Sequence, residues 1–258
     1  MANASGVPSW IDLATTDLES ARDFYSKLFG WEAQITQEPE ARGYTLFLKD
    51  GKQAAGVGPA MTPGQPPSWT MYVATDDAQF VAAKVEGAGG KILVPPTDVF
   101  DFGRMAVFAD TSGTAFAVWQ AGKHPGGEVF HEPNAYTWSE LDTRDPNAAK
   151  EFYGHVFGWI TTDRQSGPVK VTVFKLHGAP VAGMVEMVGD MWPADLPNHW
   201  MNYVAVADTD ATVAKVKQLG GAVSVEPTDI EPGRFAVISD PQGAVLSVIT
   251  RNPNFQPG

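Results

Sequence analysis

The chain contains no cysteine, and this absence removes several kinds of chemistry at once. Disulfides, thiolate nucleophiles and cysteine-ligated zinc or iron–sulfur sites all need a cysteine sulfur and are excluded. Basic residues are also scarce, because 18 lysines and arginines face 30 aspartates and glutamates, a formal net charge of -12. Since nucleic-acid binding depends on clustered lysine and arginine, this balance argues against a nucleic-acid partner.

Long apolar runs and targeting signals are missing as well. No uncharged apolar stretch is long enough to span a bilayer, so we expect no membrane partner. The first six residues, Met-Ala-Asn-Ala-Ser-Gly, lack the basic segment followed by an apolar segment that marks a signal peptide. A cytoplasmic location fits these absences best.

One stretch near the N-terminus occurs a second time in the chain. Residues 17–31 recur at 145–159, with Asp, Ala, Phe-Tyr and Phe-Gly-Trp in the same places and no gap. The apolar residues in each copy fall at spacings of three and four, which predicts a helix with one buried face. Each copy opens on an aspartate suited to an N-cap, and Gly30 and Gly158 stand where a left-handed C-cap is expected.

Weaker repeats indicate a second module in each half of the chain. Residues 77–90 match 208–221, and the turn Asp110-x-x-Gly113 matches Asp240-x-x-Gly243. Each half therefore contains two segments of strand, helix and further strands separated by turn residues. The strands that open the four modules are expected at 9–14, 70–74, 137–142 and 201–205. We predict a first domain over 7–121, a linker over 122–134 and a second domain over 135–251.

These motifs resemble those of the glyoxalase/bleomycin-resistance/extradiol-dioxygenase group, the vicinal oxygen chelate superfamily. The resemblance rests on Asp-x3-Ala-x2-Phe-Tyr-x3-Phe-Gly-Trp after the first strand and on Asp-x-x-Gly before the last, and it covers residues 9 to about 250. It is strongest to two-domain actinobacterial members that carry hydroxylase or glyoxalase-like labels. It implies an α+β fold of four βαβββ modules in two tandem glyoxalase-like domains, each a cup-shaped, eight-stranded, half-open barrel.

The resemblance leaves the reaction open, because the superfamily contains lyases, isomerases, ring-cleaving dioxygenases, epoxide-opening enzymes and drug-sequestering proteins. It also leaves two pairings of modules open. The continuous order suggests that each cup forms within one half, and exchange between the first and last modules is the alternative.

The residues at the metal-binding positions of the superfamily do not suit a metal. Metal-using relatives hold a divalent cation with His, Gln or Glu on the first strand of each module and with carboxylates on the last strands. The equivalent positions are Trp10, Gly56, Thr70 and Ala117 in the first half, and Trp138, Gly183, Met201 and Ser247 in the second. Only two of them carry oxygen, and a neutral hydroxyl is a poor sole ligand. We predict no metal and no cofactor; a metal site built around His199 is the alternative.

Strand alternation indicates which side chains line the cups instead. Neighbouring residues of a strand point to opposite faces, so Trp10 shares a face with Asp12, and Trp138 shares one with Glu140. Ile11, Leu13 and Leu141 lie on the opposite faces of these strands. If they point toward the helices, both tryptophans and both carboxylates point into the cups. The predicted ligand-binding residues are Trp10, Thr70, Tyr72, Trp138, Met201, Tyr203 and Ser247.

Asp12 and Glu140 are the candidate catalytic residues. A carboxyl group in an apolar cup has a raised pKa and can act as a general acid or base near neutrality. The alternative is structural, with each carboxylate accepting hydrogen bonds that hold the barrel closed. The two tryptophans have the same ambiguity, since an indole can stack on a planar ligand or plug an obsolete cavity.

Two classes of function fit these residues. The first is a protein that binds a small hydrophobic or aromatic molecule without a metal. The second is an enzyme, either a metal-independent lyase, isomerase or cyclase of secondary metabolism with Asp12 or Glu140 as general base, or a glyoxalase-like metalloenzyme with non-standard ligands. In both cases the expected partner is a small molecule, and the protein is a monomer or homodimer. Whether one cup or both are functional stays open.

Overall fold

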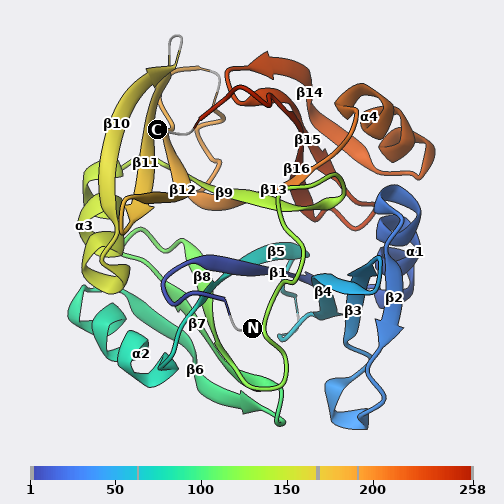
Figure 1. Ribbon diagram of the computed structural model, residues 1–258, viewed down its shortest axis with the longest axis horizontal. Coiled ribbons are helices and arrows are strands. Elements are labelled where there is room, and N and C mark those ends of the chain that lie inside the picture. Colours follow the sequence, from blue (N-terminus) through green and yellow to red (C-terminus); the bar gives the residue numbers. More distant parts are fainter. Residues whose placement is uncertain (1–2, 63, 167–168, 191, 257–258) are drawn as a thin grey trace.

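The computed structural model describes residues 3–62, 64–166, 169–190 and 192–256, and its strands form two eight-stranded sheets (Figure 1). Residues 1 and 2, which belong to the N-terminal stretch considered for a signal peptide, lie outside the described residues. No helix in the described ranges is both long and apolar enough to cross a membrane.

The first half contains eight strands and two α-helices. They are β1 (Pro8–Thr15), α1 (Leu18–Phe29), β2 (Glu32–Ile35), β3 (Thr45–Lys49), β4 (Lys52–Pro59), β5 (Ser68–Ala74), α2 (Ala78–Gly87), β6 (Lys91–Val99), β7 (Gly103–Ala109) and β8 (Ala115–Ala121). A 3₁₀ turn at Pro39–Ala41 lies between β2 and β3.

The second half repeats this order. Its elements are β9 (Ala135–Thr143), α3 (Pro146–Phe157), β10 (Ile160–Ser166), β11 (Val169–Leu176), β12 (Ala179–Glu186), β13 (His199–Ala205), α4 (Thr209–Gln218), β14 (Ala222–Ile230), β15 (Gly233–Ser239) and β16 (Val245–Arg251).

The caps of the repeated helices are those that the sequence predicts. The Asp17 side chain accepts a hydrogen bond from the backbone N–H of Ser20, and Asp145 accepts one from Ala148. Each bond satisfies a donor that the first helical turn leaves without a partner. Gly30 adopts a left-handed conformation with φ 73° at the C-cap, where a side chain would strain the backbone.

Each sheet is built from one half of the chain. The strand order is β2-β3-β4-β1-β5-β8-β7-β6 in the first sheet and β10-β11-β12-β9-β13-β16-β15-β14 in the second. The opening strands of the two modules, β1 and β5, pair antiparallel at the centre, as do β9 and β13. The modules therefore join within each half, and the alternative of exchange between the first and last modules does not occur. Neither sheet closes, so each forms a half-open cup.

The helices and the backs of both sheets form one layer that the two halves share. In Figure 1, α1 lies beside α4 on the right, and α2 lies beside α3 on the left. One apolar cluster combines Ile11 and Tyr25 of the first half with Val213 and Leu246 of the second. A second cluster combines α2 with α3 in the same way. Because each half covers the helices of the other, the two cups open in opposite directions.

Two equivalent chains of buried hydrogen bonds cross between the halves. The Trp69 indole donates to the Tyr25 hydroxyl at 3.0 Å, and that hydroxyl donates to Asp240 Oδ2 at 3.2 Å. The other oxygen of Asp240 accepts from the backbone of its own turn at Ala244. The repeated Phe-Tyr pair and the repeated Asp-x-x-Gly turn are therefore two ends of the same contact.

The second chain of bonds repeats the first with the halves exchanged. Trp200 donates to Tyr153 at 2.8 Å, and Tyr153 donates to Asp110 Oδ2 at 3.1 Å. Burial, followed by the nearby Asp110 carboxylate, raises the pKa of Tyr153 well above its usual value, so this phenol stays a donor. Burial, followed by the Asp240 carboxylate, raises the pKa of Tyr25 in the same way.

We expect the substitutions Tyr25→Phe and Tyr153→Phe each to lower the free energy of unfolding by about 1–3 kcal/mol, because each leaves a buried indole N–H and a carboxylate oxygen without a partner. Urea denaturation followed by circular dichroism measures the change. A loss below about 0.5 kcal/mol for both variants would contradict a role for these bonds in joining the halves.

Candidate functional site

The first cup is the concave face of the first sheet, and its floor is aromatic. Trp10, Tyr72 and Trp119 form a buried cluster there together with Ala117. Trp10 lies opposite Tyr72 in the sheet register, and Tyr72 lies opposite Ala117. Thr70 is partly buried and lies opposite Asp12. Ile11 and Leu13 point the other way, into the shared helix layer.

A tyrosine occupies the space above Asp12. The Tyr44 hydroxyl donates to Asp12 Oδ2 at 2.6 Å, and a Cβ added to Gly56 would lie only 2.0 Å from the Tyr44 oxygen. Glycine at this position is therefore what allows the phenol to reach the carboxylate. Burial raises the pKa of Asp12 to about 6, while hydrogen bonding from Tyr44 and Trp10 opposes the shift.

The linker covers the same cup. The His124 ring packs edge-on against Trp10 with ring centres 4.7 Å apart, and the Trp119 indole donates to the His124 backbone oxygen at 2.8 Å. Burial lowers the pKa of His124 to about 4, so the ring is neutral at pH 7. The backbone N–H of Gly127 donates to Ser9 at 2.7 Å and holds the linker on β1. Trp10 is left only 3% exposed.

The second cup, the concave face of the second sheet, is more open. Met201, Tyr203 and Ile249 form a buried cluster, with Trp138, Phe235 and Val237 packed against it. Trp138 lies opposite Tyr203, and Tyr203 lies opposite the fully buried Ser247. Trp138 and Glu140 are only partly buried. Leu141 points into the shared helix layer, as its strand position predicts.

Glu140 has one internal partner in this cup. The Tyr203 hydroxyl donates to Glu140 Oε1 at 2.9 Å, and Oε2 makes no hydrogen bond to another described residue. Sheet register places Val171 where the first cup has Tyr44, because Leu46 pairs with Gly56 and Val173 pairs with Gly183. Val171 therefore cannot supply to Glu140 the second phenol that Tyr44 supplies to Asp12.

Burial and a neighbouring carboxylate make Glu140 harder to ionise. Burial, followed by the neighbouring Asp142 carboxylate, raises the pKa of Glu140 to about 8, although Tyr203 and His199 oppose the shift. His199 Nε2 lies 3.3 Å from Asp142 Oδ2. Burial lowers the pKa of His199, but contact with Asp142 outweighs burial and the net shift is upward. In the first half the equivalent positions carry Ala14 and Ser68, which cannot form such a pair.

Flexible side chains bridge the two edges of the second cup. Arg164 on the edge strand β10 forms an ion pair with Glu231 in the turn after β14, and Ser166 donates to the same carboxylate at 3.0 Å. The Arg164 guanidinium also lies over the Phe255 ring, 4.9 Å from its centre. Both contacts of Arg164 lie at the rim of the cup rather than in its floor.

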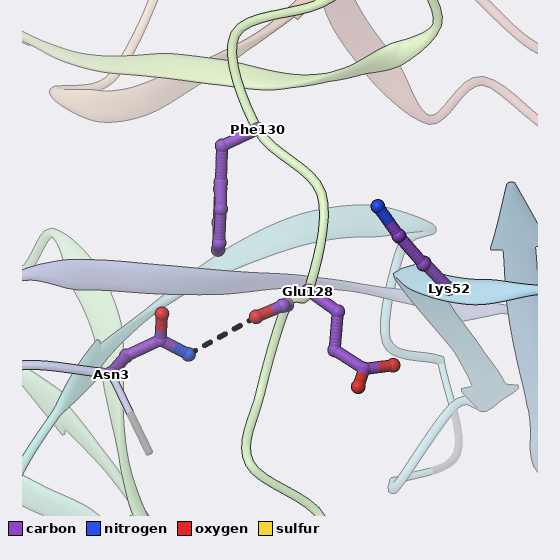
Figure 2. A pocket seen from close by; sticks show the side chains of 5 residues that line it. Asn3, Lys52, Glu128 and Phe130 are labelled. Atoms are coloured by element: carbon purple, nitrogen blue, oxygen red, sulfur yellow. Dashed lines mark hydrogen bonds between the residues drawn. The ribbon is translucent and has the colours of Figure 1, made fainter. Parts of the chain in front are cut away.

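Two hollows lie along the linker. Figure 2 shows the larger, of about 300 Å³, where Asn3 donates to the Gly127 oxygen and Lys52 and Glu128 stand on the opposite side. The smaller, of about 150 Å³, reaches Trp138 at the border of the second cup. Neither hollow is lined by Asp12 or Glu140.

The residues at the metal positions do not fit a divalent cation. In the sheets, Asp12 pairs with Gly56 and Glu140 pairs with Gly183. Indoles, small apolar residues and single hydroxyls supply no set of N and O donors. Across the described ranges, no three histidine, aspartate or glutamate side chains are arranged to hold a metal, and His199 belongs to no such group.

Several residues of the two cups escape prediction from sequence. Tyr44 lies outside every repeated motif, and His124 lies in a stretch whose composition indicates only a linker. Strand alternation does place Asp142 on the same face as Glu140, so its position on the concave face could be predicted from the sequence. Its cross-strand contact with His199 depends on the pairing of β9 with β13, which the sequence alone does not supply.

Comparison with known proteins agrees with this architecture. The family model described as the Glyoxalase/Bleomycin resistance protein/Dioxygenase superfamily matches residues 8–118 and 136–248. Anthracycline biosynthesis protein DauV of Streptomyces sp. (strain C5) is 42% identical over 262 residues, which cover 95% of this chain and 94% of DauV. CFP32 of Mycobacterium tuberculosis (strain CDC 1551 / Oshkosh), provisionally named a glyoxylase, is 40% identical over 257 residues, 96% of each chain.

A solved structure shows the same fold at low sequence identity. The Mn(II)-bound glyoxalase from Novosphingobium aromaticivorans superimposes with a TM-score of 0.66 at 15% identity, over 95% of this chain and 82% of that one. With two family matches, one on each sheet, the chain belongs to the glyoxalase/bleomycin-resistance/dioxygenase superfamily, as a protein of two tandem glyoxalase-like domains.

Proposed function

We propose that the protein binds a small hydrophobic or aromatic molecule in the second cup, and that the first cup is closed by the chain itself. The observation that carries the proposal is the contrast at the two carboxyl groups. Asp12 is covered by Tyr44, whereas Glu140 has a free oxygen and stands beside a partly buried indole. Mostly apolar walls with few polar groups are typical of small-molecule sites.

The walls of the second cup suit a flat ligand. Trp138 offers an indole face, and Met201, a flexible and polarizable side chain, adapts to irregular shapes. Tyr203 is held by its bond to Glu140 and closes the floor together with Ser247. In the first cup, Trp10, Thr70 and Tyr72 would meet a ligand only after the linker moved away.

The names of relatives support an aromatic ligand. DauV and DnrV of Streptomyces peucetius, both 42% identical to this chain, are named anthracycline biosynthesis proteins. Anthracyclines are polycyclic aromatic compounds, and a planar ring system is the shape that an indole-walled cup accommodates. A polycyclic aromatic molecule is therefore the ligand class that we propose.

The setting of this function is part of the proposal. We expect a cytoplasmic monomer or homodimer that works without a metal or cofactor and does not bind nucleic acid. The net charge of -12 supports the last point, since it repels a phosphate backbone. The unsuitable donor set at the metal positions supports the metal-free reading over a metalloenzyme with non-standard ligands.

A second candidate function is general acid–base catalysis by Glu140, as in a metal-independent lyase, isomerase or cyclase. A base works best when its pKa lies near the operating pH, and the pKa of about 8 for Glu140 meets this condition. Asp12 is the weaker candidate for this role, because the Tyr44 hydroxyl already binds one of its oxygens.

Binding in one cup predicts one ligand per chain. Native mass spectrometry of the freshly purified protein reports copurified ligand, metal and oligomeric state together, and titration with bicyclic and tricyclic aromatic compounds gives the affinity. We expect Trp138→Ala to weaken binding about tenfold or more through lost stacking and apolar contact, and Trp10→Phe to leave it within about twofold. Two ligands per chain, or a larger loss for the Trp10 variant, would contradict the assignment to the second cup.

Closure of the first cup predicts that Gly56→Ala is destabilising. The new methyl group would displace the Tyr44 hydroxyl from Asp12, at a cost of about 1–3 kcal/mol. Gly183→Ala is the matched control, because the nearest atom, Trp138 Nε1, is 2.8 Å from its Cβ position and belongs to a partly exposed side chain. Urea denaturation of both variants, and of Gly56→Ala combined with Tyr44→Ala, tests the argument. If Gly56→Ala lowers the free energy of unfolding by the same amount in the Tyr44→Ala background, closure of the first cup by Tyr44 is contradicted.

Catalysis by Glu140 predicts proton exchange with a bound ketone. The ionised carboxyl would take a proton from the carbon next to the carbonyl and return a deuteron from D2O, so the exchange rate should rise as pH passes through about 8. Nuclear magnetic resonance of 1-tetralone in D2O measures the exchange. Glu140→Gln should reduce the rate to background, and an unchanged rate in that variant would remove Glu140 from the mechanism.

A further inference from the structure

Two polar atoms in the second cup lie side by side without partners. Trp138 Nε1 and Glu140 Oε2 both border the space above Gly183, where an added Cβ would lie 2.8 Å from the first and 3.4 Å from the second. Neither atom makes a hydrogen bond to any residue that the structure describes. Partly buried polar atoms without partners cost free energy unless water or a ligand satisfies them.

The first cup shows what fits at this place. Above Gly56, the equivalent glycine, the Tyr44 hydroxyl oxygen lies 2.0 Å from the Cβ position and donates to Asp12 at 2.6 Å. The chain thus places an oxygen on an aromatic ring directly above the glycine and beside the carboxyl group. In the second cup Val171 stands where Tyr44 would start, so the side-chain atoms nearest the Cβ position of Gly183 are Trp138 Nε1 and Glu140 Oε2, the two groups that an oxygen of a ligand would join.

We propose that the second cup binds an aromatic ketone or quinone whose carbonyl oxygen sits above Gly183 and accepts hydrogen bonds from Trp138 Nε1 and the Glu140 carboxyl group. This inference rests on the proposed function and names the chemistry of its ligand. A carbonyl oxygen has two lone pairs and no proton, so two donors are its natural complement.

The surroundings of Glu140 make it a donor rather than an acceptor. Its oxygen Oε1 already accepts from Tyr203, so the carboxyl proton belongs on Oε2, the atom that lies toward Gly183 and the edge of the Trp138 indole. The ionisable groups that act on Glu140 are Asp142 on its own strand and His199 and Tyr203 on β13. Burial and Asp142 together raise its pKa to about 8, so most molecules carry the proton at pH 7.

The pH dependence follows from this proton. Below about pH 8 the neutral carboxyl donates to the carbonyl, and above it the carboxylate repels the same oxygen. Affinity for a ketone should therefore fall as the pH rises through that value. Affinity for the same ring system without oxygen should not change, because it uses only the apolar walls.

Three matched ligands test the site by equilibrium dialysis at pH 6.5 and pH 9.5. They are 1-tetralone with a carbonyl, tetralin with no oxygen, and 5,6,7,8-tetrahydro-1-naphthol with a phenol. At pH 6.5 we expect 1-tetralone to bind about five- to tenfold more tightly than tetralin, the effect of one or two neutral hydrogen bonds. At pH 9.5 this preference should disappear. A phenol that binds most tightly, and gains affinity with rising pH, would overturn the proposal.

Variants separate the donors from the shape of the cup. Glu140→Gln keeps a donor, its amide N–H, at the same place, so the preference for 1-tetralone should persist at both pH values. Glu140→Leu and Trp138→Phe each remove one of the two donors, so each should reduce the preference, and Glu140→Leu should also remove its pH dependence. Glu226→Gln makes the same chemical change at an exposed glutamate that pairs with Lys217, and it should change nothing. A pH-dependent preference in Glu140→Gln would contradict the role of the carboxyl proton.

The outcomes distinguish this inference from the proposed function. If tetralin and 1-tetralone bind equally and Trp138→Ala weakens both, the aromatic cup stands and the carbonyl site is wrong. If none of the three ligands binds, or Trp138→Ala binds them as the parent protein does, both proposals are wrong.

Discussion

The buried bonds from Tyr25 to Asp240 and from Tyr153 to Asp110 are the contacts on which the rest of the architecture depends. Each joins a helix of one half to a turn of the other, inside an apolar layer that neither half could complete alone. Because the helices face inward and cover one another, both concave sheet faces are left for other uses. The layer between the sheets thus fixes the shape of the cups without contributing to their chemistry.

Given this shared scaffold, the two cups have been used differently. In the first, Tyr44 donates a hydrogen bond to Asp12 and the ring of the linker residue His124 packs against Trp10. The second has Val171 in place of the covering tyrosine, and burial together with the neighbouring Asp142 makes Glu140 harder to ionise. Asp12 therefore has a tyrosine partner that Glu140 lacks, and Glu140 Oε2 makes no hydrogen bond to another described residue. Duplicated domains allow this division because a closed cup still supports the open one through the common helix layer.

Much of this arrangement could be predicted from the sequence, since it follows from periodicity. A repeat in register and a strand period of two are enough to place Trp10 and Glu140 on concave faces and Ile11 in the core. Tyr44 and His124 could not be predicted, because each comes from a segment without repeat or period and reaches the cup through tertiary contacts. The hydrogen bonds between the halves could not be predicted for a related reason. The sequence shows the Phe-Tyr pair and the Asp-x-x-Gly turn twice each, but it does not show which copy of the pair contacts which copy of the turn.

The kind of donor in the second cup limits what chemistry it can support. A divalent cation stabilises a developing negative charge on oxygen by several kcal/mol, and the residues above Gly183 are unsuited to hold one. An indole N–H and a neutral carboxyl offer hydrogen bonds of about 1 kcal/mol each, with a gain when charge develops. Such a pair orients a carbonyl and transfers a proton, but it does not stabilise a full enolate as a metal does. These donors therefore suit the binding that we propose for this cup better than the stabilisation of a full negative charge on oxygen.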